Sequence, residues 1–195
     1  LAEARRYDRT GGSGNWLLKV RQRYRYDASN VRTVKQTLDL DPAGDPAQRV
    51  SLSVFPGDFE RRGLVRASDR YSSDPVLDTE TEYLVAGARV VWQAGAPAQG
   101  IDADHRISVA LADLLGSTSS VIDLRTGTLT QQGTYYPNGG RETLLSGQDL
   151  VPFEPNGFTG KEDDQEVGLV YFGERYLVPA LGRWLSPDPV GIHSL

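Results

Sequence analysis

Residues 158–191 read FTGKEDDQEVGLVYFGERYLVPALGRWLSPDPVG, and the rest of the chain is organised around this stretch. It contains two aromatic-rich extended pieces, Val167–Phe172 and Arg175–Leu177, on either side of a glycine and a charge pair. It ends in Ser186-Pro187-Asp188-Pro189, where each proline fixes its own φ and restricts the residue before it. We therefore expect a rigid segment that holds the Asp188 carboxylate in one place.

Alternation of apolar and polar residues predicts strands in the upstream part of the chain. Residues 16–26 place aromatic and aliphatic side chains on one face and basic side chains on the other, which is the period of a half-buried strand. A polar turn at Asp27–Asn30 leads into a partner strand over Val31–Leu38. Tyr83–Val85 and Arg89–Trp92 predict a second hairpin.

The composition favours one fold class and excludes several functions. The 195 residues include 21 glycines and 11 prolines with few stretches of helical period, which favours a turn-rich all-β protein. The absence of cysteine excludes disulfides and thiolate metal sites, and a formal net charge of −5 argues against nucleic-acid binding. No apolar run approaches the roughly 18 residues that a membrane-spanning helix requires.

We expect no cofactor and no metal. Gly157–Lys161 lacks the spacing of a phosphate-binding loop, and the lysine is followed by glutamate instead of the required Ser or Thr. The acidic run Glu162–Glu166 lacks the ligand spacing of a calcium loop, so we expect it to be a solvated face. Arg183 and Trp184 are expected to serve packing, with Trp184 in the core, where truncation to alanine would cost about 3–5 kcal/mol.

The stretch at 158–191 resembles the conserved core segment of Rhs/YD-repeat proteins, which include the C component of bacterial insecticidal toxin complexes. The family pattern runs from aromatic-x-G-K-E-x-D through G-L-Y-Y-x-x-R-Y-Y to P-x-x-G-R-W/F-x-S-x-D-P-x-G. Val178 departs from this pattern, because many members carry aspartate there. The matching positions are Gly160, Lys161, Glu162, Asp164, Gly168, Leu169, Tyr171, Arg175, Tyr176, Pro179, Gly182, Arg183, Trp184, Ser186, Asp188, Pro189 and Gly191.

Two further segments extend the resemblance upstream. Residues 24–32 are similar to one YD repeat, with Ser29 in place of the usual glycine and Val31 inserted before the arginine. Residues 113–140 resemble the family's D-x-L-G-S-T segment and the Y-x-P-x-G motif that follows it. We therefore expect YD-repeat-like β-hairpins over residues 1–103 and the Rhs repeat-associated core region over residues 104–195.

The resemblance implies a fold and a role. The fold is expected to be all-β, with successive antiparallel hairpins forming part of a large hollow shell. The chain reads as a fragment of a longer parent, which is expected to encapsulate a C-terminal toxin domain and to help release it. The implied partners are the remainder of the shell, the enclosed toxin domain and a delivery machine. The implied location is outside the producing bacterium, reached by secretion or injection.

Arg175 and Asp188 are the candidate catalytic residues that the resemblance implies. In relatives, the arginine of R-Y and the aspartate of the terminal D-P are associated with self-cleavage by an aspartyl-protease-like site. Such chemistry needs two carboxyl groups that share a proton, and the family's second aspartate would lie beyond Leu195. The alternative is a buried Arg175–Asp188 ion pair that only pins a turn.

A non-proteolytic YD-repeat adhesion or surface-binding module is the alternative function. Exposed tryptophan and tyrosine often mark sites that bind carbohydrate or a partner protein, and the aromatic content permits such a role. A second D-P motif beyond Leu195, followed by an unrelated domain, would favour the toxin. An independent hydrolase is unsupported, because the sequence contains no complete catalytic constellation.

Overall fold

The computed structural model describes residues 1–9, 15–39, 48–54, 59–67, 70–72, 78–93, 105–146 and 154–188. Within these ranges the chain forms a 12-stranded antiparallel sheet and a 4-stranded antiparallel sheet. The helices in the described part are single 3-10 turns, and none has the length or apolar character of a membrane span. The prediction of an all-β fold is confirmed.

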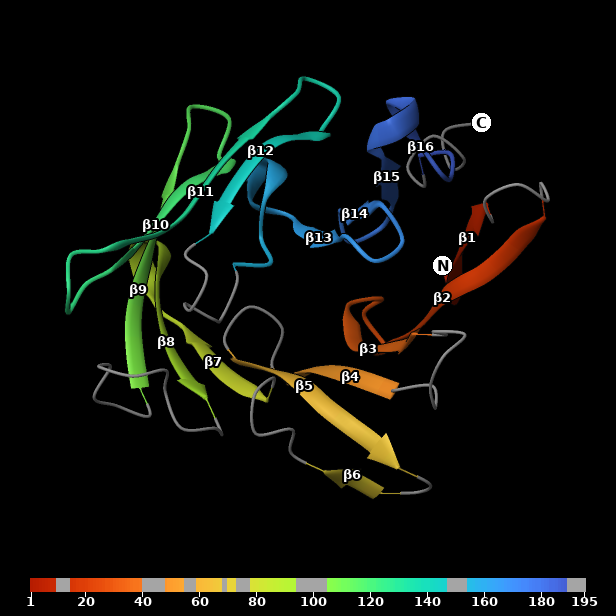
Figure 1. Cartoon of the computed structure of the whole chain (residues 1–195), viewed down its shortest axis with the longest axis horizontal. Coiled ribbons are helices and arrows are strands. Elements are labelled where there is room, and N and C mark those ends of the chain that lie inside the picture. Colours follow the sequence, from red (N-terminus) through yellow and green to blue (C-terminus); the bar gives the residue numbers. More distant parts are fainter. Residues whose placement is uncertain are drawn as a thin grey trace.

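The larger sheet is a meander that curves into an arc (Figure 1). Its order is β1-β2-β3-β4-β5-β7-β8-β9-β10-β11-β12, so that neighbours in space are neighbours in sequence, and β6 lies off this path beside β5. Its strands are β1 (Glu3–Arg9), β2 (Trp16–Tyr26), β3 (Arg32–Asp39), β4 (Gln48–Val54), β5 (Phe59–Ala67), β6 (Arg70–Ser72), β7 (Thr79–Tyr83), β8 (Ala88–Gln93), β9 (His105–Ala112), β10 (Thr118–Asp123), β11 (Leu129–Tyr135) and β12 (Arg141–Ser146).

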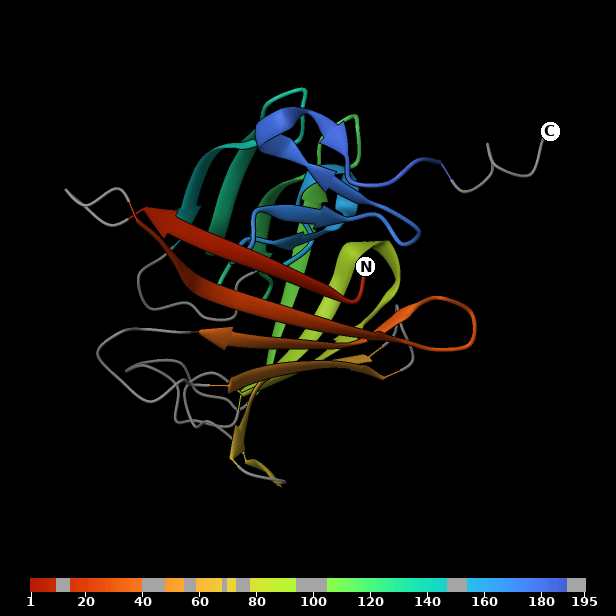
Figure 2. The same cartoon turned by 90° about the vertical axis from the view of Figure 1, so that its right-hand side faces the viewer.

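Residues 154–188, here called the strap, carry the small sheet and lie between the two ends of the arc (Figure 1). Figure 2 shows the small sheet beside β1 and β2. The strands of the strap are β13 (Glu162–Asp164), β14 (Leu169–Tyr171), β15 (Tyr176–Val178) and β16 (Arg183–Trp184), with 3-10 turns η2 (Phe158–Gly160) and η3 (Pro179–Leu181).

The strap is hydrogen-bonded to both ends of the arc. At one end, the Arg6 side chain on β1 donates a 2.9 Å hydrogen bond to the carbonyl oxygen of Glu166. At the other end, the Thr118 N–H donates to the carbonyl oxygen of Gly157 at 3.0 Å, and Asn138 Nδ2 donates to the carbonyl oxygen of Pro179 at 3.0 Å. The face of the large sheet that meets the strap is called the inner face below.

Both predicted hairpins are present, but the first strand of the second one is Thr79–Tyr83 and not Tyr83–Val85, since Leu84 and Val85 lie in the turn. β2 pairs with β3, with Tyr24 opposite Lys35, and β7 pairs with β8, with Tyr83 opposite Arg89. The second hairpin turns through η1 (Val85–Gly87), where Gly87 has a φ of 74°. A Cβ at this position would lie 2.8 Å from the carbonyl oxygen of Ala110 on β9, so both the conformation and the close approach require glycine.

Three hairpins of the arc turn on an aspartate whose carboxylate accepts backbone hydrogen bonds. Asp27 Oδ1 accepts from the N–H groups of the residues two and four positions later, at 2.8 and 2.9 Å. Asp113 Oδ1 repeats this arrangement at 2.8 Å for both bonds. Asp123 Oδ1 accepts from the residues two and three positions later, at 2.9 and 3.0 Å. An aspartate at the start of a turn satisfies N–H groups that the ladder leaves open, which explains its recurrence at this place.

A small apolar cluster of the described residues lies where the strap meets β2. Its buried centre consists of Tyr24, Leu169 and Tyr176. Much of the remaining buried surface is polar or charged, including Gln22, Asp78 and Asp164. Because buried polar groups need partners, side-chain hydrogen bonds and ion pairs must hold the strap on the sheet.

We predict that Asp123→Ala lowers the free energy of unfolding by about 1–3 kcal/mol, because two backbone N–H groups of the turn lose a charged acceptor whose side chain is buried. Asp123→Asn is the matched control, since its carbonyl oxygen can still accept, and it should lose less. Urea unfolding of the chain followed by circular dichroism measures both. Equal losses for the two variants would contradict the proposed role of the turn.

Candidate functional site

Five charged side chains meet where β13 lies on the inner face of β3 and β5, and we call them the charged clasp. Asp164 accepts from Arg32 Nη1 at 2.6 Å and from Lys35 Nζ at 2.9 Å. Glu162 accepts from Lys35 Nζ at 2.8 Å and from Arg62 Nη2 at 2.7 Å, and it also contacts Arg32. The Asp164 side chain is fully buried, and those of Arg32 and Lys35 are nearly so.

The three cations and two carboxylates of the clasp shift one another's pKa values. Burial by itself raises the pKa of Glu162, but the nearby charges of Lys35, Arg62 and Arg32 outweigh it and hold this pKa well below its usual value. Burial by itself lowers the pKa of Lys35, yet Glu162 and Asp164 together raise it. Glu162 and Lys35 are therefore ionised at neutral pH, and the ion pairs of the clasp hold the strap on the sheet.

A tyrosine cage surrounds the Arg32 guanidinium. Its central carbon lies 4.1 Å from the centre of the Tyr171 ring and 5.1 Å from that of Tyr24. Arg32 Nη1 also lies 3.3 Å from the hydroxyl of Tyr176, and this hydroxyl is 2.7 Å from that of Tyr26. Guanidinium groups are suited to this environment, because they donate in their plane while their faces pack on aromatic rings.

The prediction that residues 162–166 form a solvated face is wrong for residues 162–164, whereas Gln165 and Glu166 are exposed. Besides the clasp residues, Asp163 accepts from Arg141 at 3.0 Å, and Glu166 accepts from Gln22 at 3.0 Å. The partners lie on β2, β3, β5 and β12, far away in the sequence. An acidic run looks solvated in the sequence when the residues that pair with it lie elsewhere in the chain, and no local pattern pointed to these partners.

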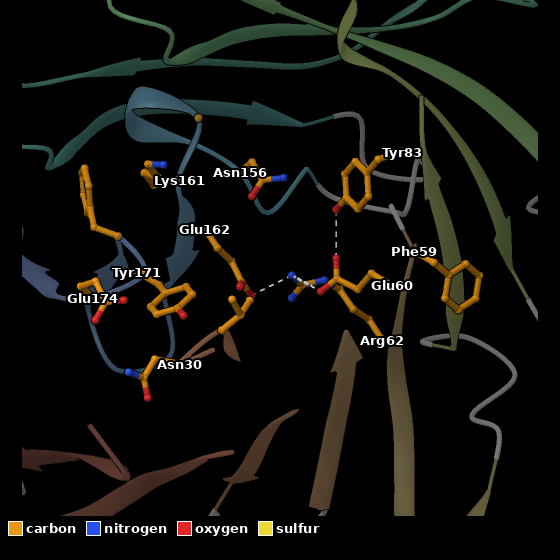
Figure 3. Close-up of a pocket in the computed structure, with 14 residues that line it drawn as sticks. Asn30, Phe59, Glu60, Arg62, Tyr83, Asn156, Lys161, Glu162, Tyr171 and Glu174 are labelled. Atoms are coloured by element: carbon orange, nitrogen blue, oxygen red, sulfur yellow. Dashed lines mark hydrogen bonds and ion pairs between the residues drawn. The ribbon is translucent and has the colours of Figure 1, made fainter. Parts of the chain in front are cut away.

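A cavity of about 490 Å³ opens beside the clasp (Figure 3). Glu60, which accepts from the Tyr83 hydroxyl at 2.9 Å, lies on one side of it with Arg62. Lys161 and Tyr171 line it from the strap. The part of the chain that the structure describes contains no group of three His, Cys, Asp or Glu side chains that could hold a metal ion.

Arg175 and Asp188 come together at the far end of the strap. Arg175 Nη1 lies 3.1 Å from Asp188 Oδ2, and the two side chains are 24% and 52% exposed. The alternative of an ion pair that pins a turn is wrong in its burial only, because the Asp188 carboxylate is open to solvent. The catalytic role of the pair stays a prediction.

Trp184 lies outside the apolar core, and the prediction that it is buried is wrong. It is 40% exposed, in the two-residue strand β16 at the edge of the small sheet. Its ring packs 4.9 Å from that of Phe172, edge to face, and 4.1 Å from the Arg175 guanidinium. Sequence reasoning favoured the core because tryptophan is most often highly buried.

Comparison with known proteins gives toxin components as relatives, although no family profile matches the chain. Toxin subunit YenC1 of Yersinia entomophaga is 31% identical over 169 residues, covering 86% of this chain and 17% of that protein. Toxin protein Tse5 of Pseudomonas aeruginosa is 30% identical over 191 residues, covering 89% of this chain and 14% of that protein. The chain thus spans about a sixth of the length of these curated relatives.

Solved structures show the same fold. The crystal structure of TcdB2-TccC3 matches 98% of this chain and 9% of its own chain, with a TM-score of 0.73 and 24% identity. A Tc holotoxin pore from Photorhabdus luminescens gives a TM-score of 0.73 at 23% identity over the same shares. The arc therefore has the fold of a stretch of the β-shell in these proteins.

We predict that Asp164→Ala lowers the free energy of unfolding by about 3–5 kcal/mol, because it leaves the buried Arg32 and Lys35 charges short of a partner. Glu174→Ala is the control, since this side chain is exposed and its loss should change stability by about 0.5 kcal/mol or less. Urea unfolding at pH 7 measures both. A loss for Asp164→Ala no larger than the control's would contradict the clasp.

The clasp should also resist mild acid. A carboxylate with a lowered folded-state pKa contributes stability above its unfolded pKa and loses it only as the pH falls through the folded value. The stability difference between wild type and Glu162→Gln should therefore be nearly as large at pH 4.5, the ordinary pKa of glutamate, as at pH 7. Urea unfolding at the two pH values tests this, and a difference that vanishes at pH 4.5 would refute it.

Proposed function

Because the chain belongs to the Rhs/YD-repeat family, with bacterial toxin subunits among its relatives, we propose that it is a wall segment of a toxin shell that encloses a C-terminal toxin domain. The observation that carries this proposal is the strap, which ties the two ends of a curved sheet together. A sheet held in a fixed curve suits a container wall. The toxin role also supports delivery outside the producing bacterium, by secretion or injection, with the rest of the shell and a delivery machine as partners.

The free edges of the arc support continuation into a larger shell. β1 and β12 each pair on one side with a neighbour, and within the described residues no strand pairs with their other sides. An open edge of this kind promotes aggregation unless another strand covers it, and a shell wall provides that strand. We also propose that the division into hairpins at 1–103 and a core region at 104–195 is one of sequence motif, because β8 and β9 pair across it.

The second part of the proposal is that Asp188 takes part in releasing the toxin domain by hydrolysis of a peptide bond. A carboxylate accepts a proton from water as the water attacks the carbonyl carbon. A second carboxylic acid protonates the leaving amine, so that the C–N bond breaks to give a carboxylic acid and an amine. The exposure of Asp188 supports this role, because attacking water and a substrate segment can reach it. The paired guanidinium of Arg175 orients the carboxylate.

Cleavage is tested in the full-length protein that contains this chain. Asp188→Asn should abolish release of the C-terminal domain without changing the melting temperature, because an amide is nearly isosteric but cannot cycle a proton. Glu174→Gln, an exposed acid on the same strap, is the control and should release the domain normally. Gel electrophoresis of the purified proteins gives the answer. Complete cleavage of the Asp188→Asn protein would show that Asp188 is structural.

Enclosure is tested separately by limited proteolysis. We expect the C-terminal domain to resist trypsin inside the intact protein and to be digested when it is expressed alone. The comparison needs the Asp188→Asn protein, so that the domain remains attached. Equal digestion in both settings would refute encapsulation and favour an adhesion module.

A further inference from the structure

The exposed side of the strap holds a stack of three side chains that ends at Asp188. Phe172 follows β14, Arg175 immediately precedes β15, and Trp184 lies on β16, whose backbone pairs with β15 opposite Leu177. The Phe172 and Trp184 rings meet edge to face, with an interplanar angle of 88°. The Trp184 ring is therefore fixed from two directions, by its strand and by Phe172, before Arg175 packs on it.

The geometry divides the guanidinium of Arg175 between two contacts. The guanidinium lies over the Trp184 ring, with 4.1 Å between its carbon and the ring centre. Nη1 meets the Asp188 carboxylate at 3.1 Å. These contacts are compatible because a guanidinium packs through its face and donates through the N–H groups in its plane. Trp184 thus restrains where the guanidinium lies, while Nη1 remains available to Asp188.

We infer that Trp184 is a positioning residue, which holds the Arg175 guanidinium in the place where it orients the Asp188 carboxylate. This inference rests on the proposed function, because it assigns Trp184 to the same cleavage site. A long arginine side chain at a partly exposed turn loses considerable rotamer freedom when it is fixed in one conformation. The ring restrains the side chain beforehand, so Asp188 meets a donor already in place.

A plain packing role for Trp184 explains less. The residue lies apart from the buried cluster of Tyr24, Leu169 and Tyr176, and it leaves 40% of its surface exposed. It also stands within four residues of Asp188, at the start of the segment that carries the carboxylate. A packing residue would be replaceable by any apolar side chain of similar size, whereas a positioning residue needs an aromatic face.

The test measures the rate of release of the C-terminal domain from the full-length protein. Trp184→Leu should slow release about tenfold, the size expected from loss of one cation–π contact in a partly exposed site. Trp184→Phe should retain a rate within about threefold of wild type, because it keeps an aromatic face. Arg175→Lys keeps the charge but loses the planar packing, and it should also slow release about tenfold.

A double-mutant cycle separates positioning from general damage. If Trp184 acts through Arg175, the protein carrying both Arg175→Gln and Trp184→Leu should be no slower than Arg175→Gln alone. If the double variant is slowed by the product of the two single effects on the release rate, the inference is overturned. Release at the wild-type rate by Trp184→Leu or Arg175→Lys would also overturn it. Thermal unfolding of each variant identifies a protein that fails to fold. If Trp184→Leu fails to fold, the release rate of Arg175→Lys tests the inference instead, because this variant leaves Trp184 in place.

A readout independent of cleavage completes the test. In a crystal structure of the full-length Trp184→Leu protein, the Arg175 guanidinium should have moved away from Asp188, and an intact contact near 3.1 Å would overturn the inference. Failure of the proposed function gives a different result. In that case Asp188→Asn releases the domain normally, whereas a failed positioning role leaves Asp188→Asn inactive and Trp184→Leu active.

Discussion

The ion pairs between β13 and the inner face of β3 and β5 are the constraint on which the rest of the structure depends. A meander joins each strand only to its neighbours, so pairing alone does not fix how far the whole sheet curves. The strap does, and Asp164 binds Arg32 across 132 positions of sequence. A buried ion pair rarely stabilises a protein more than well-packed apolar residues do, but a buried charge without its partner is strongly destabilising. The clasp therefore contributes mainly specificity, because only one placement of the strap satisfies every charge.

Aspartate serves two different purposes in this chain. At Asp27, Asp113 and Asp123 the carboxylate accepts hydrogen bonds from backbone N–H groups of its own hairpin turn, so neighbours in the sequence determine the contact. At Asp164 the same kind of side chain is buried against cations of a strand far away in the sequence, so the contact depends on the complete fold. Tyrosine is divided in a similar way, since Tyr24 and Tyr176 form the apolar centre and also surround the Arg32 guanidinium. A small core can hold the strap because its residues carry both kinds of contact.

Features that depend on contacts between neighbours in the sequence could be predicted, whereas features that depend on distant contacts could not. The hairpins at 16–38 and 83–92 follow from alternation and turn chemistry, and only the first strand of the second was misplaced, because it ends at Tyr83. The proximity of Arg175 and Asp188 followed from a family motif rather than from physical reasoning. The acidic run was misassigned because nothing within ten residues of Glu162 indicates Arg32, Lys35 or Arg62. Trp184 was misassigned because a tryptophan at a sheet edge has the same local pattern as one in a core. The sequence also predicts a loop over residues 39–48, of which residues 40–47 lie outside the described part of the chain.

The order of the clasp along the chain has a consequence for synthesis on the ribosome. Arg32, Lys35 and Arg62 are made early, and the carboxylates that neutralise them emerge about 130 residues after the first. At typical translation rates this delay is on the order of ten seconds. During that interval Arg32 and Lys35 lack the carboxylates of the strap, so the buried ion pairs that fix the strap on the sheet cannot form. Fixing the curve of the arc is thus coupled to completion of the strap, because a chain that ends before Glu162 cannot form the clasp.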